Sequence, residues 1–306
     1  MSSTRLLTVL LVLLSSSLLA TAGFSTVYDD TFARWFVKVS GAAYSKSPDK
    51  CLQNIDELGD DWSVALVHET RCSPFLSEQS RCQVVVFKSD VQKQYIVAFR
   101  GSVGNKQLVE QVLEASPVKF ENFGLVSDYL QKSFYTLWPS VLGQIKNAKQ
   151  EGYSIIVTGF SLGGALSHIT ALKIVSGGIQ TSDNVYLLTF GSPRIGNHEF
   201  AKNVDKAIKF RHRVVNKNDL IPHFPPCWPS LFQPNTCTTL ISDNYYHSQQ
   251  EIWYAAGSSA PGSPYITTTT NEDPKGSNRV SINLKVADHL TYFGYDLEKY
   301  GLNNCA

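Results

Sequence analysis

The sequence predicts an α/β fold in which a mostly parallel central sheet is flanked by helices. Short runs of β-branched and apolar residues alternate with segments whose apolar residues recur at helical spacing. Such alternation gives right-handed crossovers between parallel strands and leaves functional loops at the carboxyl ends of the strands. The 43% hydrophobic content and the net charge of +1 favour one large core and argue against nucleic acid as a partner.

The first residues have the features of a secretory signal peptide. Arg5 supplies a positive charge, residues 6–19 form an apolar and serine-rich core, and Ala20-Thr21-Ala22 matches a cleavage site. A membrane anchor is the competing interpretation, but this core is shorter than the ~20 residues that span a bilayer. We expect a signal peptide over residues 1–22, a single domain over residues 23–306, no transmembrane segment, and a secreted, extracellular protein.

The sequence also predicts a series of strands, helices and loops. Two β-rich runs, residues 84–88 and 95–100, are separated by the turn signal Ser89-Asp90. A long turn-rich stretch, residues 257–277, predicts an exposed loop or a hairpin with flexible ends. The other expected elements are an amphipathic segment within 101–118, helices around 126–148, 162–175 and 197–208, and strands at 153–157, 185–190, 210–215, 252–254 and 280–286.

One strand is followed by a serine between glycines, Gly159-Phe160-Ser161-Leu162-Gly163, which matches the nucleophile-elbow pattern GxSxG. In an elbow, the serine occupies a strained strand-to-helix turn, and the glycines remove side chains that would clash with neighbouring backbone. The helix that follows favours developing negative charge at its N-terminus. The alternative is a glycine-rich turn with a serine N-cap. We expect Ser161 to be a catalytic nucleophile.

A serine nucleophile needs an acid that orients its base, and in elbow hydrolases this acid follows the serine in the chain. Asp219 comes just past the strand predicted at 210–215, where its side chain can reach across the end of the sheet. Its alternative role is an Asx-type turn before Pro222. Asp205, in a helical pattern, and Asp243, in a polar loop, are weaker candidates.

The base must be a histidine that follows the acid, and three histidines do so. His223 is only four residues from Asp219 on a proline-flanked loop, which favours a structural role. His247 precedes a strand-like segment and is compatible with a buried, hydrogen-bonded histidine. His289, in a predicted loop near the C-terminus, is the preferred base.

Six cysteines in a chain with a predicted signal peptide favour disulfides over metal ligation, because no CxxC or clustered Cys/His spacing occurs. Fifteen pairings of six cysteines are possible in principle. The preferred pairs each close a local polar loop, Cys72 with Cys82 and Cys227 with Cys237, and leave Cys51 with Cys305.

Taken as an ordered set, these motifs resemble the class 3 lipases. The chain is similar to the filamentous-fungal triacylglycerol lipases from about Ala43 to its C-terminus, and it looks like a secreted animal relative of them. The motifs are Phe-Arg-Gly-Ser at 99–102, the elbow at 159–164, the segment 213–223, His247 before 251–254, and Asp-His-Leu-Thr-Tyr-Phe at 288–293.

The resemblance implies an α/β-hydrolase fold with Ser161, Asp219 and His289 as its triad. It also implies an oxyanion hole formed by Ser102, through its backbone N–H and hydroxyl, and by the backbone N–H of Leu162. It assigns His247 a structural role.

The lid segment of the family is where this sequence departs from the pattern. Family members usually carry a tryptophan and an Asp-Leu pair there, whereas this chain reads Val-Gly-Asn-Lys-Gln-Leu-Val-Glu-Gln-Val-Leu over residues 103–113. We hypothesise that its apolar residues form a short lid that opens at a lipid interface, with an ordinary surface helix as the alternative. These residues are Leu108, Val109, Val112 and Leu113.

The predicted function is therefore that of a triacylglycerol lipase, a carboxylic ester hydrolase that works through an acyl-enzyme. No metal or organic cofactor is expected, the expected partner is a lipid ester, and no feature of the sequence indicates an oligomer, so a monomer is expected. Two alternatives remain at this point. One is a feruloyl-type or phospholipid esterase on the same scaffold, and the other is a secreted lipid-binding protein without catalysis.

Overall fold

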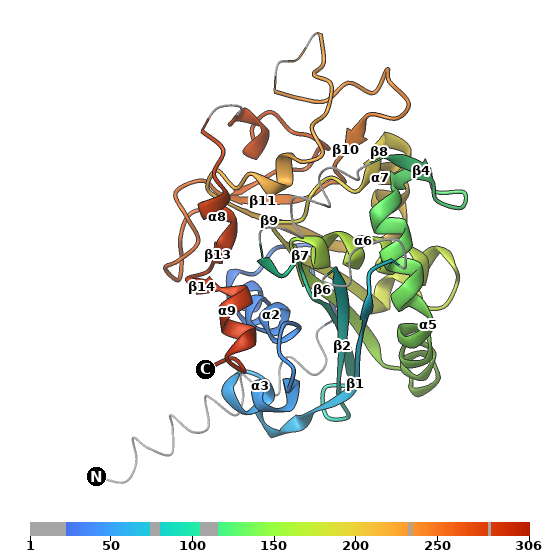
Figure 1. Cartoon of the computed structure of the whole chain (residues 1–306), viewed down its shortest axis with the longest axis vertical. Coiled ribbons are helices and arrows are strands. Elements are labelled where there is room, and N and C mark those ends of the chain that lie inside the picture. The colour runs from blue at the N-terminus through green and yellow to red at the C-terminus, as the bar shows by residue number, and fades with distance from the viewer. Residues whose placement is uncertain (1–22, 74–79, 105–115, 232, 234, 281–282) are drawn as a thin grey trace.

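The computed structural model describes residues 23–73, 80–104, 116–231, 233, 235–280 and 283–306. The predicted signal peptide and the four apolar residues of the predicted lid lie outside these ranges. The centre of the molecule is an eight-stranded sheet with the strand order β1-β2-β3-β6-β7-β9-β11-β12 (Figure 1). These strands are β1 (Trp62–Arg71), β2 (Arg81–Ser89), β3 (Gln94–Phe99), β6 (Ser154–Phe160), β7 (Val185–Phe190), β9 (Phe210–Asn216), β11 (Glu251–Tyr254) and β12 (Ile266–Thr267).

The middle of this sheet is parallel and its margins are antiparallel. β3, β6, β7, β9 and β11 pair in parallel, whereas β1, β2 and β12 join the sheet as antiparallel strands. The predicted mostly parallel sheet is thus confirmed. Because parallel strands all end at one edge, the loops that follow them converge there.

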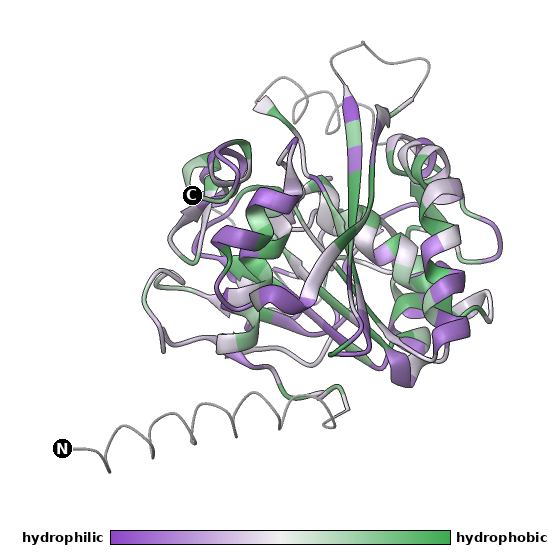
Figure 2. Cartoon of the chain, turned by 90° about the horizontal axis from the view of Figure 1, so that it is seen from below, coloured by the Kyte–Doolittle hydropathy of each residue, from purple (hydrophilic) through white to green (hydrophobic). Residues whose placement is uncertain are grey.

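Helices cover both faces of the sheet, so the molecule has three layers (Figures 1 and 2). α5, α6 and α7 pack on one face, and α2, α3 and α9 lie on the other. The helices are α2 (Asp30–Ala42), α3 (Pro48–Asn54), α5 (Asp128–Glu151), α6 (Leu162–Ser176), α7 (His198–Ala207), α8 (Val286–Leu290) and α9 (Leu297–Leu302), with short 3₁₀ turns at Gly59–Asp61, Ser182–Asn184, Ile221–His223 and Ser277–Arg279.

Two hydrophobic cores result from the alternation of side chains along the strands. In β2, Val84 and Val86 join the core under α5 and α6, while Val85 and Phe87 join the core under α2. Since successive strand residues point to opposite faces, a strand buried on both sides is apolar throughout. This explains the mostly apolar runs of β3, β6 and β7. β9 is equally buried, but it carries Arg211, His212 and Arg213, each of which has a polar or charged partner.

Smaller elements complete the fold at the margins. A four-stranded sheet has the order β10-β8-β5-β4, and β13 and β14 form a two-stranded pair. Their bounds are β4 (Pro117–Lys119), β5 (Leu125–Ser127), β8 (Gly196–Asn197), β10 (Tyr245–Tyr246), β13 (Thr291–Tyr292) and β14 (Tyr295–Asp296). Within the described ranges, no helix has both the length and the apolar character needed to cross a bilayer.

The structure contains three disulfide bonds, and they join the cysteines that the sequence analysis preferred to pair. Cys51–Cys305 ties α3 to the end of the chain, and Cys72–Cys82 links the end of β1 to the start of β2. Cys227–Cys237 closes the loop that follows β9 and a 3₁₀ turn.

Two differences from the expected elements are informative. α2 and β1 were not predicted, although Asp29 caps α2 by accepting hydrogen bonds from Thr31 N and Phe32 N. The strand expected at 280–286 is wrong for the residues of that segment that the structure describes. Val280 follows the 3₁₀ turn Ser277–Arg279, Lys285 makes only an isolated β-bridge with Asp219, and α8 begins at Val286. His289, expected in a loop, therefore lies in a short helix.

Candidate active site

Ser161 occupies a sharp turn between β6 and α6. β6 ends at Phe160, α6 begins at Leu162, and Ser161 between them has φ 57° and ψ −125°. A positive φ is rare for a residue with a side chain, and it is tolerated here because the surrounding structure fixes the turn. The turn lifts the serine hydroxyl above the carboxyl edge of the sheet.

The glycines around Ser161 are required by close backbone packing. A Cβ on Gly159 would lie 2.4 Å from the carbonyl carbon of Gly163, and one on Gly163 would lie 2.1 Å from the carbonyl oxygen of Phe99. No side chain fits at these distances, so both positions need glycine. The α6 N-terminus can thereby sit directly against the end of β3.

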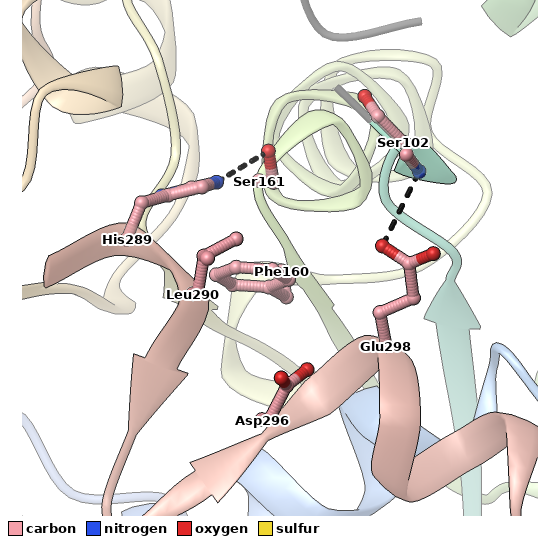
Figure 3. A pocket seen from close by; sticks show the side chains of 8 residues that line it. Ser102, Phe160, Ser161, His289, Leu290, Asp296 and Glu298 are labelled. Carbon is pink, nitrogen blue, oxygen red and sulfur yellow. Dashed lines mark hydrogen bonds between the residues drawn. The ribbon is translucent and has the colours of Figure 1, made fainter. Parts of the chain in front are cut away.

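Three side chains from distant parts of the chain meet at this turn. His289 Nε2 lies 2.9 Å from Ser161 Oγ (Figure 3). On the other side of the ring, His289 Nδ1 lies 2.8 Å from Asp219 Oδ2. Because a carboxylate only accepts hydrogen bonds, Nδ1–H donates to Asp219 and Nε2 accepts from the serine hydroxyl. All three side chains are buried, and the imidazole is oriented to take a proton from Ser161.

Asp219 is held by three donors. Besides His289, the Ile221 backbone N–H donates to its Oδ1 at 2.8 Å, and the Tyr292 hydroxyl donates to its Oδ2 at 2.5 Å. Burial, followed by the charge of Asp219, raises the pKa of Tyr292 well above its usual value, so its hydroxyl stays protonated as a donor. Three donors fix the position of the carboxylate and compensate its burial.

His289 is positioned by its own surroundings as well. Phe160 stacks on its ring, with centroids 4.6 Å apart and 25° between the planes. The Asn216 side chain donates to the carbonyl oxygens of Asp288 and Thr291 at 3.1 and 2.9 Å. The segment around the histidine is therefore fixed to the end of β9, which is also the strand that leads to Asp219.

Tyr292, Asn216 and Phe160 are site residues that the sequence analysis did not identify. Tyr292 and Phe160 lie within motifs that it quoted, but only as aromatic residues of those motifs. Asn216 lies within the quoted segment 213–223 and is the last residue of β9. A polar residue at the carboxyl end of a parallel strand is the sequence signal that could have identified it.

Ser102 and Leu162, the predicted oxyanion-hole residues, flank Ser161. Ser102 follows β3 and lines the same pocket as Ser161, and Leu162 is the first residue of α6. The backbone N–H groups of the first helical turn have no acceptor within their own helix. Leu162 therefore brings a backbone donor to the region beside the serine, and Ser102 approaches the serine from the end of β3.

A pocket opens beside the serine and the histidine (Figure 3). Its walls come from the loop after β3, the elbow, α8 and the start of α9. The lining residues are Ser102, Gly104, Phe160, Ser161, His289, Leu290, Asp296 and Glu298.

The other predicted candidates lie elsewhere. His247 is buried, and its Nε2 lies 2.6 Å from the carbonyl oxygen of Pro222. Burial and the neighbouring Arg213 lower the pKa of His247 well below its usual value. His223 belongs to a 3₁₀ turn, Asp205 pairs with Arg211, and Asp243 is exposed.

In the part of the chain that the structure describes, no three His, Cys, Asp or Glu side chains gather as a metal site.

Comparison with known protein families gives a match to the family described as "Lipase (class 3)" over residues 96–228. A Caenorhabditis elegans protein, Lipase ZK262.3, is 31% identical over 297 residues, which cover 91% of this chain and 83% of the relative. The Rhizomucor miehei lipase is 30% identical over 69% of this chain. The aligned region spans 54% of that fungal relative, about half its length.

Solved structures share the fold. A crystal structure of the lipase from Rhizopus microsporus var. chinensis superposes with a TM-score of 0.70 at 24% identity, covering 93% of this chain and 92% of the other. The predicted α/β-hydrolase fold, with its mostly parallel central sheet and flanking helices, is confirmed by this similarity together with the strand order described above.

Proposed function

This chain belongs to the class 3 lipase family and is a carboxylic ester hydrolase, and we propose that it is a triacylglycerol lipase with Ser161, His289 and Asp219 as its catalytic triad. The observation that carries the proposal is the pair of hydrogen bonds that His289 makes, at 2.9 Å to Ser161 Oγ and at 2.8 Å to Asp219 Oδ2. The same imidazole can thus take the serine proton while the carboxylate stabilises the resulting positive charge.

The first half of the proposed reaction forms an acyl-enzyme. His289 Nε2 takes the Ser161 proton as Oγ attacks the acyl carbonyl carbon, and the carbonyl oxygen becomes an oxyanion. When the tetrahedral intermediate collapses, the bond to the alcohol oxygen breaks, and His289 gives its proton to the departing alcohol. In the second half, water attacks the acyl group in the same way and the fatty acid leaves.

The oxyanion is proposed to accept hydrogen bonds from the Leu162 backbone N–H and from Ser102. The position of Leu162 in the first turn of α6 supports this, because the positive end of the helix faces the developing charge. Loss of one such donor typically costs ~3–4 kcal/mol of transition-state stabilisation.

The lipid substrate and the extracellular location are proposed from features outside the site. Three disulfides are consistent with an oxidising compartment. The sequence from residue 224 to residue 242 contains no charged side chain, and Trp228, Leu231 and Leu240 within it are 66%, 89% and 80% exposed. Such an uncharged, exposed apolar segment is suited to a lipid–water interface.

The test compares wild type, Ser161→Ala and a matched control, Ser176→Ala. Ser176 is the exposed last residue of the same helix, α6. Fatty-acid release is measured from emulsified triacylglycerol, and p-nitrophenol release from p-nitrophenyl butyrate. We expect wild type and Ser176→Ala to hydrolyse both substrates and Ser161→Ala to lose ~10⁵-fold or more of its activity.

The other outcomes identify the alternatives. Hydrolysis of p-nitrophenyl butyrate without triacylglycerol hydrolysis would indicate an esterase of another ester class. A folded wild-type protein that neither hydrolyses these esters nor reacts with a fluorophosphonate at Ser161 would be a lipid-binding protein.

A further inference from the structure

The pocket beside Ser161 has an acidic wall. Asp296, the last residue of β14 and the N-cap of α9, and Glu298 in the first turn of α9 line the same pocket as Ser161 and His289 (Figure 3). In the mechanism above, no step needs a carboxylate on this side of the pocket. Its position beside the reacting groups therefore calls for a separate explanation.

The two acidic residues of the pocket differ in their partners. Among the ion pairs of the described residues, Glu298 has no cationic partner, so no cation neutralises its charge at the pocket. Asp296 Oδ2 is paired with Lys299 Nζ at 3.0 Å. Glu298 Oε2 instead accepts a hydrogen bond from the backbone N–H of Gly104 at 3.3 Å, and its carboxylate points toward Ser102 (Figure 3). The charge thus lies against the loop that carries a proposed oxyanion donor.

Glu298 is held at this position by its surroundings. The Asp296 side chain caps α9 by accepting from Lys299 N, and Leu297 between the two acidic residues is fully buried. Gly301 in the same helix packs so tightly on α2 that a Cβ would lie 2.0 Å from the Gly41 carbonyl oxygen. Cys305, just beyond α9, is bonded to Cys51. The backbone that carries Glu298 is therefore rigid.

A fixed carboxylate in a pocket repels anions and leaves uncharged molecules unaffected. The low-dielectric walls of a pocket strengthen this effect relative to open solvent. Discrimination between substrates can rest on such an unfavourable contact with the wrong partner.

We propose that Glu298 is a specificity-determining residue that makes the pocket selective for uncharged esters over esters that carry a negative charge. This inference rests on the proposed ester hydrolysis at Ser161. It assigns neutral acylglycerols as the substrate class and places esters with an anionic acyl chain or an anionic head group among the poor substrates.

The experiment compares two soluble esters with the same leaving group, neutral p-nitrophenyl butyrate and the anionic mono-p-nitrophenyl ester of glutaric acid. kcat/KM for both is measured in wild type, Glu298→Gln, Glu298→Lys and the control Glu199→Gln. Glu199 is an exposed glutamate in the first turn of α7, and it does not line the pocket.

We expect Glu298→Gln to lower the neutral-to-anionic ratio of kcat/KM by about tenfold, the effect of one unit charge acting over several ångströms at protein-like dielectric. Glu298→Lys lowers the ratio further, and Glu199→Gln leaves it at the wild-type value. In wild type the ratio falls as salt is raised from 0.01 M to 0.5 M, since salt screens the charge.

An unchanged ratio in folded Glu298→Gln overturns the inference, including the case in which both activities fall equally, because the role would then be structural. If Glu298→Gln does not fold, the salt dependence of the wild-type ratio decides, and a ratio that does not change with salt overturns the inference. Absence of Ser161-dependent hydrolysis of p-nitrophenyl butyrate in wild type would instead contradict the proposed function itself.

Discussion

Two buried histidines in this protein, His289 and His247, each lie close to a buried carboxylate, and the two arrangements differ in what surrounds them. His289 Nδ1 contacts Asp219 through its side chain, and its Nε2 faces a serine hydroxyl at a pocket. His247 contacts Glu272 only through its backbone N–H, at 2.6 Å, and its ring Nε2 faces the carbonyl oxygen of Pro222.

The carboxylate near His247 is neutralised by an arginine. Arg194 Nε and Nη2 donate to Glu272 at 2.9 and 3.0 Å, and Asn278 also donates to it. The Arg194 and Glu272 side chains are only 4% and 0% exposed. We call Arg194, Glu272, Asn278 and His247 the Arg194 cluster, and Ser161, His289, Asp219 and Tyr292 the Ser161 cluster.

Residue types alone do not define a catalytic site. Both clusters contain a buried histidine and a buried carboxylate. Only in the Ser161 cluster does one ring nitrogen contact the carboxylate while the other contacts a serine hydroxyl that borders a pocket. The Arg194 cluster supports the loop that carries the acid, since Arg194 Nη1 donates to the His223 carbonyl oxygen at 2.7 Å and His247 contacts Pro222. The geometry therefore favours the Ser161 cluster as the site of the proposed proton transfer and gives the Arg194 cluster a structural role.

Of the substitutions that distinguish the two clusters, replacement of Asp219 should have the largest effect on activity. Asp219→Asn should lower kcat/KM for p-nitrophenyl butyrate by about 10⁴-fold, because an amide in place of the carboxylate favours the wrong histidine tautomer. The thermal unfolding midpoint should change little by comparison. Asp183→Asn, at an exposed surface position, is the control. A loss of less than tenfold would remove Asp219 from the proposed triad.

The second-largest effect is expected in the Arg194 cluster, where a substitution should lower stability and leave activity nearly unchanged. Arg194→Met should lower the free energy of unfolding by ~3–5 kcal/mol, because it leaves the buried Glu272 charge uncompensated. kcat per folded molecule should stay close to the wild-type value. Urea unfolding measures the first quantity, and active-site titration with a fluorophosphonate supports the second.

The matched control is Lys209→Met, which breaks the exposed pair of Lys209 with Asp183 and should cost only ~0–1 kcal/mol. Equal losses in Lys209→Met and Arg194→Met would contradict the distinction between a buried and an exposed ion pair.

The buried histidines outside the Ser161 cluster should make stability depend on pH. Burial lowers the pKa of His212 to about 4, whereas the unfolded chain takes up this proton near pH 6.5. The unfolded state therefore binds more protons below pH 6.5, and stability is lost as the pH falls from about 6.5 toward 4. Each such histidine contributes up to ~1.4 kcal/mol per pH unit in this window.

Urea unfolding of wild type and His212→Gln at pH 7.5, 6.5, 5.5 and 4.5 measures this contribution. The slope of unfolding free energy against pH should be smaller in His212→Gln. Parallel curves for the two proteins would show that His212 does not titrate differently in the folded and unfolded states.

Removal of the Tyr292 hydroxyl, which donates to Asp219, should have the smallest effect on activity. Tyr292→Phe removes one donor to the carboxylate and should reduce kcat/KM by about fivefold to tenfold, in line with the ~1 kcal/mol that one hydrogen bond contributes. Asp219 keeps its contacts with His289 and the Ile221 N–H. Tyr135→Phe, an exposed tyrosine 43% accessible to solvent, is the control. An unchanged rate in Tyr292→Phe would mean that His289 and Ile221 suffice to hold the acid.

Much of the fold could be predicted because its signals are local. The runs at 84–88, 95–100, 153–157 and 185–190 became strands because residues buried on both faces of a sheet are mostly apolar. The run at 210–215 also became a strand, although it buries Arg211, His212 and Arg213. β1 was missed because it pairs only with β2 at the margin of the sheet, where it is partly exposed and its sequence is mixed. The segment 280–286 resembles a strand in sequence, but its end forms the start of α8.

The sequence by itself determined the elbow, because the strand, the turn and the helix around Ser161 are neighbours in the chain and their glycines answer local packing needs. It also ordered the candidates for the acid and the base. Only the tertiary structure decided which residues meet, since His289 lies 128 residues from Ser161 and 70 from Asp219 along the chain. Contacts over such separations depend on how the sheet and its crossovers bring the strand ends together.

The dependence on long-range contacts also explains why Tyr292 and Glu298 could not be identified from the sequence. Nothing in the local sequence shows that one hydroxyl reaches Asp219 or that one carboxylate borders the pocket. The position of Tyr292 follows from the contacts of its segment with Asn216 at the end of β9. The position of Glu298 follows from the packing of α9 on α2 and from the Cys51–Cys305 bond, which join the two ends of the described chain.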